Sequence, residues 1–421
     1  MLFYPVYALL FADAGLSTAQ ISTLFVIWSV VSFVFEVPSG AWADAWSRRR
    51  LYALGAFLTA AGYASWTLWP AYAGFALGFV LWGLGGALCS GTLEALLYDE
   101  LGDGASYARV AGRGGTVAIL AMLAATVLAS PVFAFGGYLL VGAFSVAVPA
   151  VGGFLALGFH EGRREATGPS ATEPNNETGP NNETGPNNET GPNNETGPNS
   201  ETGPNSETEP NDETEPEQPA GYLATLRAGI GEALSTRRVA WAVLIAALVP
   251  GFTALDEYLP LLSRAAGAPT AVVPLLYALP ALAMAGGSAL AGRWSAISAP
   301  RLGAALAAAA VLLAGGALCG LLAGGALCGR LVGMLPIALA FGVLQFAIIV
   351  TETRLQESIT GAARATVLSV AGFASEVFAV LLYAMFGGGA GFASVPTLFA
   401  LCALPLLATA VAAGRQHHRT G

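Results

Sequence analysis

The stretch Gly40-Ala-Trp-Ala-Asp44-Ala-Trp-Ser-Arg48-Arg49-Arg50-Leu51 separates two long apolar runs near the N-terminus. Residues 21–37 before it are almost wholly hydrophobic, and residues 51–69 after it contain no charged side chain. A spanning helix needs roughly 20 mostly apolar residues, so the pattern predicts a tight turn between two membrane helices. The acid and the three arginines of this turn would then lie on one face of the membrane.

The composition is typical of a polytopic membrane protein. Of 421 residues, 55% are hydrophobic, 11% are charged and 53 are glycine, which in lipid lets neighbouring helices approach closely. The net charge is −9, and more than half of the acids lie between His160 and Arg238, so no nucleic-acid partner is indicated. The four cysteines stand singly in apolar runs, which favours buried thiols over a metal site or disulfides.

The apolar runs predict six helices, a long gap and six more helices, an all-α membrane fold of two six-helix bundles. The first run is too short to cross a bilayer, so the first helix is either truncated or a short helix packed against others. The predicted domains are 1–159, a linker over 160–238, and 239–421. The predicted spans are 2–12 (partial), 21–39, 51–69, 72–97, 110–133, 136–159, 239–262, 272–291, 302–323, 331–350, 365–386 and 393–413.

The arginines support this count, because cytoplasmic loops of membrane proteins collect basic residues. If the turn at Asp44 to Arg50 is cytoplasmic, all arginines except Arg264 and Arg330 fall on the same side. We therefore expect a multi-pass protein of the cell membrane with both termini in the cytoplasm.

The gap between the bundles contains tandem six-residue units over residues 175–216, rich in proline, glycine and glutamate. Such a composition cannot bury enough surface to fold, which predicts a disordered cytoplasmic linker. Its Asn-x-Thr sequons would mark glycosylation only on an external loop. Within residues 222–236, apolar positions at helical spacing beside arginine predict an amphipathic helix on the inner membrane surface.

The helix count, the central linker and the Gly40–Arg49 pattern together resemble the major facilitator superfamily of secondary transporters. The family signature reads Gly-x-x-x-Asp-x-x-Gly-Arg-(Arg/Lys); Gly40, Asp44, Arg48 and Arg49 match it, and Ser47 replaces the second glycine. The resemblance extends to residues 36–40, 90–99 and 364–369, and so touches both halves.

The resemblance implies that the turn is a conformational latch. Asp44 would meet the start of the helix at Arg364, while Arg48 and Arg49 would pair with Glu94 and Asp99. The alternative is that these charges only hold the inner loops at the lipid headgroups. The second half has Gly292 where the acid should be, so the latch would be one-sided.

Ionisable residues inside a span are costly and are therefore candidates for function. Glu376 lies near the middle of span eleven and is predicted to be a proton-coupling site or a counter-charge for a cationic substrate; the alternative is a structural hydrogen bond. Further cavity candidates are Asp256 and Glu257 late in span seven, Glu36 near the inner end of span two, and Gln345 in span ten.

The function indicated is secondary active transport of a small solute by alternating access, with proton-coupled efflux as the candidate mode. No catalytic constellation, phosphate-binding loop or metal site is visible, so we expect no enzyme activity and no cofactor. Two motifs common in drug/proton antiporters are missing, which counts against that class. We expect a monomer whose partners are the solute, protons and the lipid bilayer. A non-transporting membrane sensor on the same fold remains the alternative.

Overall fold

The computed structural model describes residues 1–90, 92–93, 96, 104–158, 231, 236–294, 296–322, 332–359 and 364–415. This part of the chain is helical, and no strand occurs in it. The predicted linker repeat and nearly all of the predicted amphipathic segment lie outside these residues, and both stay predictions.

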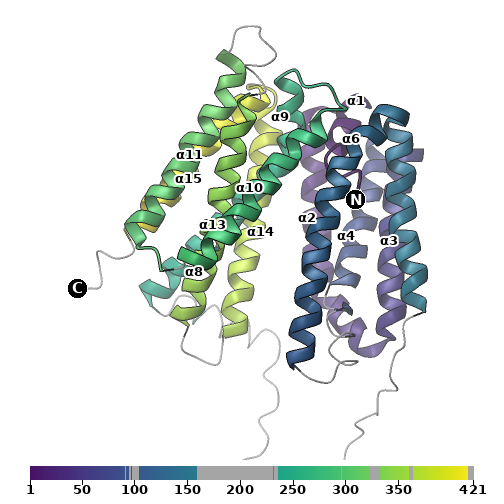
Figure 1. Ribbon diagram of the computed structural model, residues 1–421, viewed down its shortest axis with the longest axis horizontal. Helices are drawn as coiled ribbons and strands as arrows, with labels where there is room; N and C mark the ends of the chain where they lie inside the picture. Colours follow the sequence, from purple (N-terminus) through teal and green to yellow (C-terminus); the bar gives the residue numbers. More distant parts are fainter. Residues whose placement is uncertain are drawn as a thin grey trace, which may run out of the picture. The chain divides into compact units, whose positions relative to one another are not determined.

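The first half contains five helices among the described residues (Figure 1). They are α1 (Tyr7–Asp13), α2 (Thr18–Ala45), α3 (Arg48–Leu68), α4 (Tyr72–Cys89) and α6 (Gly104–Leu157). Helix α6 has non-helical backbone angles at Gly136 and Gly137, where it joins the two spans predicted separately at 110–133 and 136–159. Gly137 has a φ of 56°, a left-handed conformation that glycine adopts without strain.

The second half begins with a span that is broken into three parts: α8 (Arg237–Gly251), the 3₁₀ segment η1 (Phe252–Tyr258) and α9 (Leu259–Ala265). Pro260 bears on the C-terminal end of this break, because it has no N–H to donate to the carbonyl of Asp256 four residues earlier. That carbonyl accepts instead from the N–H of Leu259, three residues on, which is the 3₁₀ pattern. The remaining helices are α10 (Val273–Trp294), α11 (Ala299–Leu322), α13 (Met334–Ser358), α14 (Arg364–Gly389) and α15 (Val395–Gly414).

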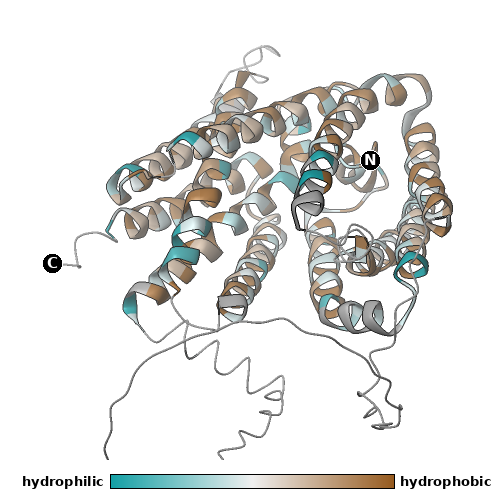
Figure 2. Cartoon of the chain, turned by 60° about the horizontal axis from the view of Figure 1, so that its bottom comes forward, coloured by the Kyte–Doolittle hydropathy of each residue, from teal (hydrophilic) through white to brown (hydrophobic). Residues whose placement is uncertain are grey.

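Within the described residues, nine helices are long and apolar enough to cross a membrane. One of them, Arg113–Leu157, has 45 residues, about twice the roughly 20 that one crossing needs. Hydrophobic residues predominate along the helices in Figure 2. Large apolar side chains such as Phe135 and Phe154 are 88% and 68% exposed, which suits a surface in contact with lipid tails.

The turn around Asp44 is shorter than the sequence indicated. Helix α2 continues through Gly40 and Asp44 to Ala45, and only Trp46 and Ser47 separate it from α3. The Ser47 side chain accepts a hydrogen bond from the backbone N–H of Arg50 at 3.4 Å and caps α3. Ser47 has φ −62°, so this position needs no glycine, which accounts for the departure from the signature.

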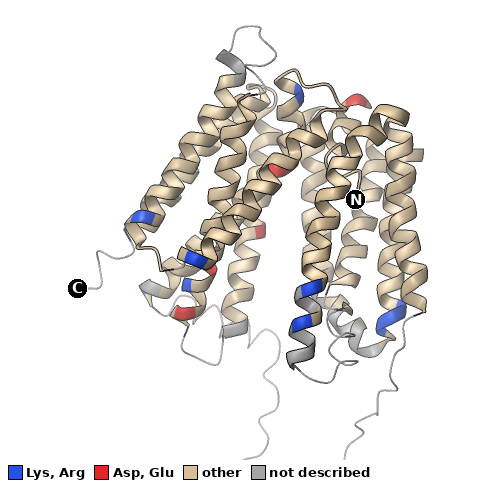
Figure 3. Ribbon diagram, in the orientation of Figure 1, with Lys and Arg blue, Asp and Glu red and all other residues tan. Residues whose placement is uncertain are grey.

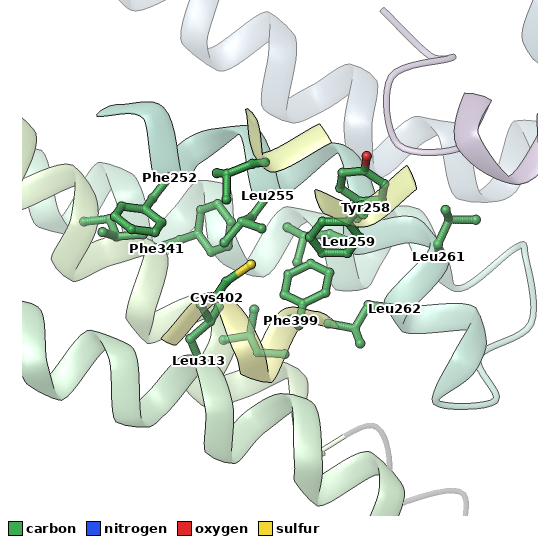
Figure 4. Close-up of a cluster of buried hydrophobic side chains, with 14 of the residues drawn as sticks. Phe252, Leu255, Tyr258, Leu259, Leu261, Leu262, Leu313, Phe341, Phe399 and Cys402 are labelled. Carbon is green, nitrogen blue, oxygen red and sulfur yellow. The ribbon is translucent and has the colours of Figure 1, made fainter. Parts of the chain in front are cut away.

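Tyr258 connects η1 to two different environments. Its ring stacks on Phe386 of α14 at 3.9 Å between centroids and packs among buried side chains of the second half (Figure 4). Its hydroxyl points away from that cluster and shares a 2.7 Å hydrogen bond with Ser22 of α2, in the first half. The broken span is therefore packed into one half and bonded to the other.

The backbones of α10 and α13 approach each other closely at a glycine of each helix. A side chain added at Gly287 would overlap the carbonyl oxygen of Gly342, whereas one added at the neighbouring Gly286 would meet nothing within 4 Å. We expect Gly287→Ala to lower the free energy of unfolding by about 1–3 kcal/mol, the range for overpacking. Gly286→Ala is the matched control and should be neutral or stabilising by up to about 1 kcal/mol. Thermal unfolding in detergent measures both, and equal melting temperatures would contradict close packing at Gly287.

Candidate functional site

Two adjacent acids of the 3₁₀ segment η1 make hydrogen bonds to tyrosines on different helices. Successive residues of a 3₁₀ helix, with three residues per turn, point about 120° apart, so Asp256 and Glu257 diverge. The hydroxyl of Tyr277 on α10 donates to Asp256 Oδ2 at 3.2 Å. The hydroxyl of Tyr4, in the first half, donates to Glu257 Oε1 at 3.4 Å. Glu257 is 5% exposed, and its bond to Tyr4 joins the two halves of the chain.

Glu376 of α14 belongs to the same neighbourhood. The buried Tyr383, two helical turns further along α14, is close enough to Glu257, Asp256 and Glu376 to interact electrostatically with each of them. We call Asp256, Glu257, Glu376, Tyr4, Tyr277 and Tyr383 the carboxylate cluster. The sequence singled out its three acids separately; in the structure all three lie within electrostatic range of Tyr383.

Glu376 faces helix α2 of the first half. Ser29 and Glu36 of α2 both interact with it. Ser29 is buried, at 4% exposure, and its side chain is close enough to Glu376 to form a hydrogen bond with it. Ser22, Phe25, Ser29 and Phe33 recur at helical spacing on α2, and Phe25 and Phe33 contact Tyr383 and Phe373 of α14 at 5.4 and 4.9 Å between centroids.

Aromatic rings border the cluster on the first-half side. The Tyr4 ring lies 5.8 Å from Tyr277 and 6.3 Å from Trp82 of α4. Trp82 in turn stacks on Trp28 of α2, with 5.3 Å between centroids and 20° between the rings. We call Tyr4, Tyr277, Trp82 and Trp28 the aromatic wall. It supplies apolar faces directly beside the buried acids.

A second contact joins the halves where α1 and α9 end. Arg264 donates to both carboxylate oxygens of Asp13, at 2.5 and 3.0 Å, and also to Thr270 Oγ1 at 3.0 Å. Tyr138 of α6 donates to Asp13 Oδ2 at 2.5 Å. Gly15 and Gly267, both with φ near 90°, end the two helices just beyond the pair. Burial alone would raise the pKa of Asp13, but the bonds from Arg264 and Tyr138 outweigh it and hold this pKa below its usual value.

The charges are unevenly placed along the helices. In Figure 3 the arginines of the described residues lie near helix ends, whereas acids also occur midway along the helices. Arg354, near the end of α13, illustrates the first group: it donates to the backbone carbonyl of Ile297. No arginine therefore accompanies the carboxylate cluster in the part of the chain that the structure describes.

The structure describes only some of the residues of the predicted latch. Arg48 and Arg49 begin α3, Arg364 begins α14, and Asp44 lies in the last turn of α2 instead of beyond it. Glu94 and Asp99 lie outside the described residues, so the latch pairs stay a prediction. Glu36 is exposed on α2, and Gln345 is half-buried on α13.

Asp13, Tyr4, Tyr138 and Tyr277 were not predicted as site residues from the sequence. A usable signal existed for Asp13, because Arg264 stood out as an arginine on the wrong side. A lone base at that level of the membrane needs an acid at the same level, and Asp13 directly follows the first apolar run. The three tyrosines carry no such signal, because aromatic residues in membrane helices are common packing residues.

A sequence model of the Major Facilitator Superfamily matches residues 1–381, most of the chain. The chain belongs to this superfamily. Searching curated protein sequences gave no match. Solved structures of superfamily-type transporters share the fold at low identity. The nucleoside transporter NupG matches with a TM-score of 0.67 and 10% identity, over 99% of this chain and 95% of that one.

Two further structures give the same result. The D-xylose-proton symporter has a TM-score of 0.64 and 13% identity, over 99% of this chain and 93% of that one. A bacterial homologue of the iron transporter ferroportin has a TM-score of 0.62 and 14% identity, with the same coverage of 99% and 93%. The predicted superfamily and the all-α membrane fold are thereby confirmed, whereas the count of twelve helices and the linker stay predictions. The protein is a multi-pass membrane protein of a transporter family whose members bind small-molecule substrates.

Proposed function

We propose that this chain is a secondary active transporter that moves a small solute across the cell membrane by alternating access, coupled to protons. The observation that carries the proposal is the carboxylate cluster, in which Glu257 of the second half bonds to Tyr4 of the first. In superfamily transporters the two halves rock around a site between them. A bond of this kind breaks or forms as the halves move, so occupancy of the site and conformation are linked.

Coupling to protons follows from the nature of the cluster. An ionised carboxylate in a spanning segment costs at least about 2.5–3.5 kcal/mol on insertion scales unless it is paired. A proton removes that cost when the site faces one side of the membrane and is released on the other. Glu376 is the proposed coupling residue because it lies at the contact between α14 and α2, which belong to different halves.

The arginine pattern supports an orientation. We propose that the Arg48–Arg50 end of the molecule faces the cytoplasm, and with it both termini. The Asp13–Arg264 contact then closes the outer side, and the site would open inward. Outward movement of the solute in exchange for incoming protons is the direction proposed.

The test is transport by the purified protein in proteoliposomes, screened over cationic drugs, sugars and organic acids with a pH gradient of either sign. The wild type should move at least one solute class, faster with the gradient that drives protons inward. Glu376→Gln should abolish the flux or remove its pH dependence while the protein still folds, because the amide cannot carry the proton. Glu352→Gln, an acid on α13 outside the cluster, is the matched control.

Two results would defeat the proposal. The transport function fails if no solute class moves above the rate of empty liposomes. Glu376 fails as the coupling residue if its glutamine variant keeps both the flux and the pH profile of the wild type.

A further inference from the structure

The carboxylate cluster also bears on which solute is carried, and this step rests on the proposed function. We infer that the solute is a monovalent organic cation, such as a protonated amine or a quaternary ammonium, bound beside the acids of the carboxylate cluster and the rings of the aromatic wall. Two features of the site support this inference: its charge and its rings.

The charge of the site calls for a positive partner. Asp256, Glu257 and Glu376 lie around Tyr383, and the spans that carry them place their arginines only near the helix ends. The hydroxyls of Tyr4 and Tyr277 donate hydrogen bonds but bring no charge. Acids inside a membrane protein normally pair with bases, coordinate cations or bind protons. A proton on two of the three carboxylates and a cationic ligand at the third would satisfy the set.

The rings favour an organic cation over a bare metal ion. Tyr4 stands beside both the acid pair and the indole of Trp82, at 3.4 Å from Glu257 and 6.3 Å between ring centroids. The stacked Trp28 extends the same wall. Aromatic faces attract ammonium groups and cover apolar substituents at the same time. A small, strongly hydrated metal ion would gain nothing from these rings, because it binds through oxygen ligands.

The inference is tested by equilibrium binding to the purified full-length protein in detergent. Two cations are compared with neutral counterparts: tetraphenylphosphonium with triphenylphosphine oxide, and choline with 3,3-dimethyl-1-butanol. At least one cation should bind saturably and at least tenfold more tightly than its neutral counterpart. Glu257→Gln and Asp256→Asn should each weaken that binding at least tenfold, and Trp82→Leu at least fivefold. Glu352→Gln should leave it unchanged.

The inference is overturned if neither cation binds saturably, if the neutral counterparts bind equally well, or if sodium alone competes for the cluster. The inference is also overturned if Glu257→Gln and Asp256→Asn fold and bind the cation as tightly as the wild type. Size-exclusion chromatography shows whether Glu257→Gln folds. If it does not, the inference is tested by cation binding to Asp256→Asn and by the ratio of the wild type's affinities for the cation and for its neutral counterpart. Proton-coupled flux of a sugar or an acid without cation binding would refute this inference alone. Cluster-dependent cation binding without any flux would instead refute the proposed function.

Discussion

Reversing the charge of Arg264 by the substitution Arg264→Glu is expected to open the contact between α1 and α9 and to lower transport at least tenfold. In the wild type Arg264 holds Asp13 through two hydrogen bonds, with side chains 30% and 43% exposed. An exposed ion pair contributes only about 0.2–1 kcal/mol. Two carboxylates at the same place repel each other, so the total change is on the order of 2 kcal/mol, roughly thirtyfold in an equilibrium between conformations.

The opening is measured by labelling a cysteine at Ser22, which is 1% exposed in the closed contact. The native cysteines are first replaced by alanine, and a membrane-impermeant maleimide is applied from outside. Arg264→Glu should speed the labelling, and the exchange Asp13→Arg with Arg264→Asp should restore both labelling and flux in part. Arg301→Glu, an exposed arginine at the start of α11, is the control. Equal labelling in Arg264→Glu and the wild type would show that the pair does not close this side.

The pH dependence of transport should not arise at this contact. Because the pKa of Asp13 is lowered, ionised Asp13 stabilises this contact at pH values above the usual aspartate pKa of about 3.9. That stabilisation is lost only below this pH. A flux profile that changes between about pH 5 and 8 must therefore come from other groups.

Tyr258→Ala is expected to lower the free energy of unfolding by about 3–5 kcal/mol, the range for removing a large buried ring. The ring is fully buried and stacks on Phe386, so its loss leaves a cavity where the broken span is packed into the second half. Tyr258→Phe keeps the ring and removes only the bond to Ser22. It should cost about 1 kcal/mol and favour the conformation in which the halves separate there.

Chemical or thermal unfolding in detergent measures both variants, and labelling of the thiol introduced by Ile21→Cys, at a residue that is 1% exposed, reports the separation. If the alanine variant is no less stable than the phenylalanine variant, the ring does not anchor η1. Substitution of the exposed Phe392, 95% exposed, by alanine is a control for loss of an aromatic ring without a cavity.

Hydropathy was sufficient to predict most of the helices, because the bilayer imposes length and charge rules on each span separately. The superfamily was predicted from the resemblance of the Gly40–Arg49 signature together with the helix count and the linker. Hydropathy also placed Asp256, Glu257 and Glu376 at membrane depth. The pairing of Glu257 with Tyr4 joins residues 253 positions apart, and that of Arg264 with Asp13 joins residues 251 apart. Rules that act within one span carry no information on such pairs.

The 3₁₀ segment was also beyond the sequence analysis, although Pro250 and Pro260 mark its surroundings. A proline removes one hydrogen bond, and whether the helix kinks, tightens or unwinds depends on which neighbouring groups can take the freed carbonyl. Here Leu259 does so. The extent of the latch turn was wrong for a related reason: polar residues ended the apolar run at Gly40, but the backbone stays helical to Ala45.

The two-residue link Trp46–Ser47 has a mechanical consequence. It leaves only two residues between the two helices, so a displacement of the end of α2 is passed directly to the start of α3. The 24 residues from Ser22 to Ala45 rise about 35 Å along α2, at about 1.5 Å for each step between residues. A tilt of about 10° around the Ser22 contact would displace the far end of α2 by about 6 Å. A small rotation near Tyr258 therefore produces, at the far end of α2, a displacement as wide as a small solute.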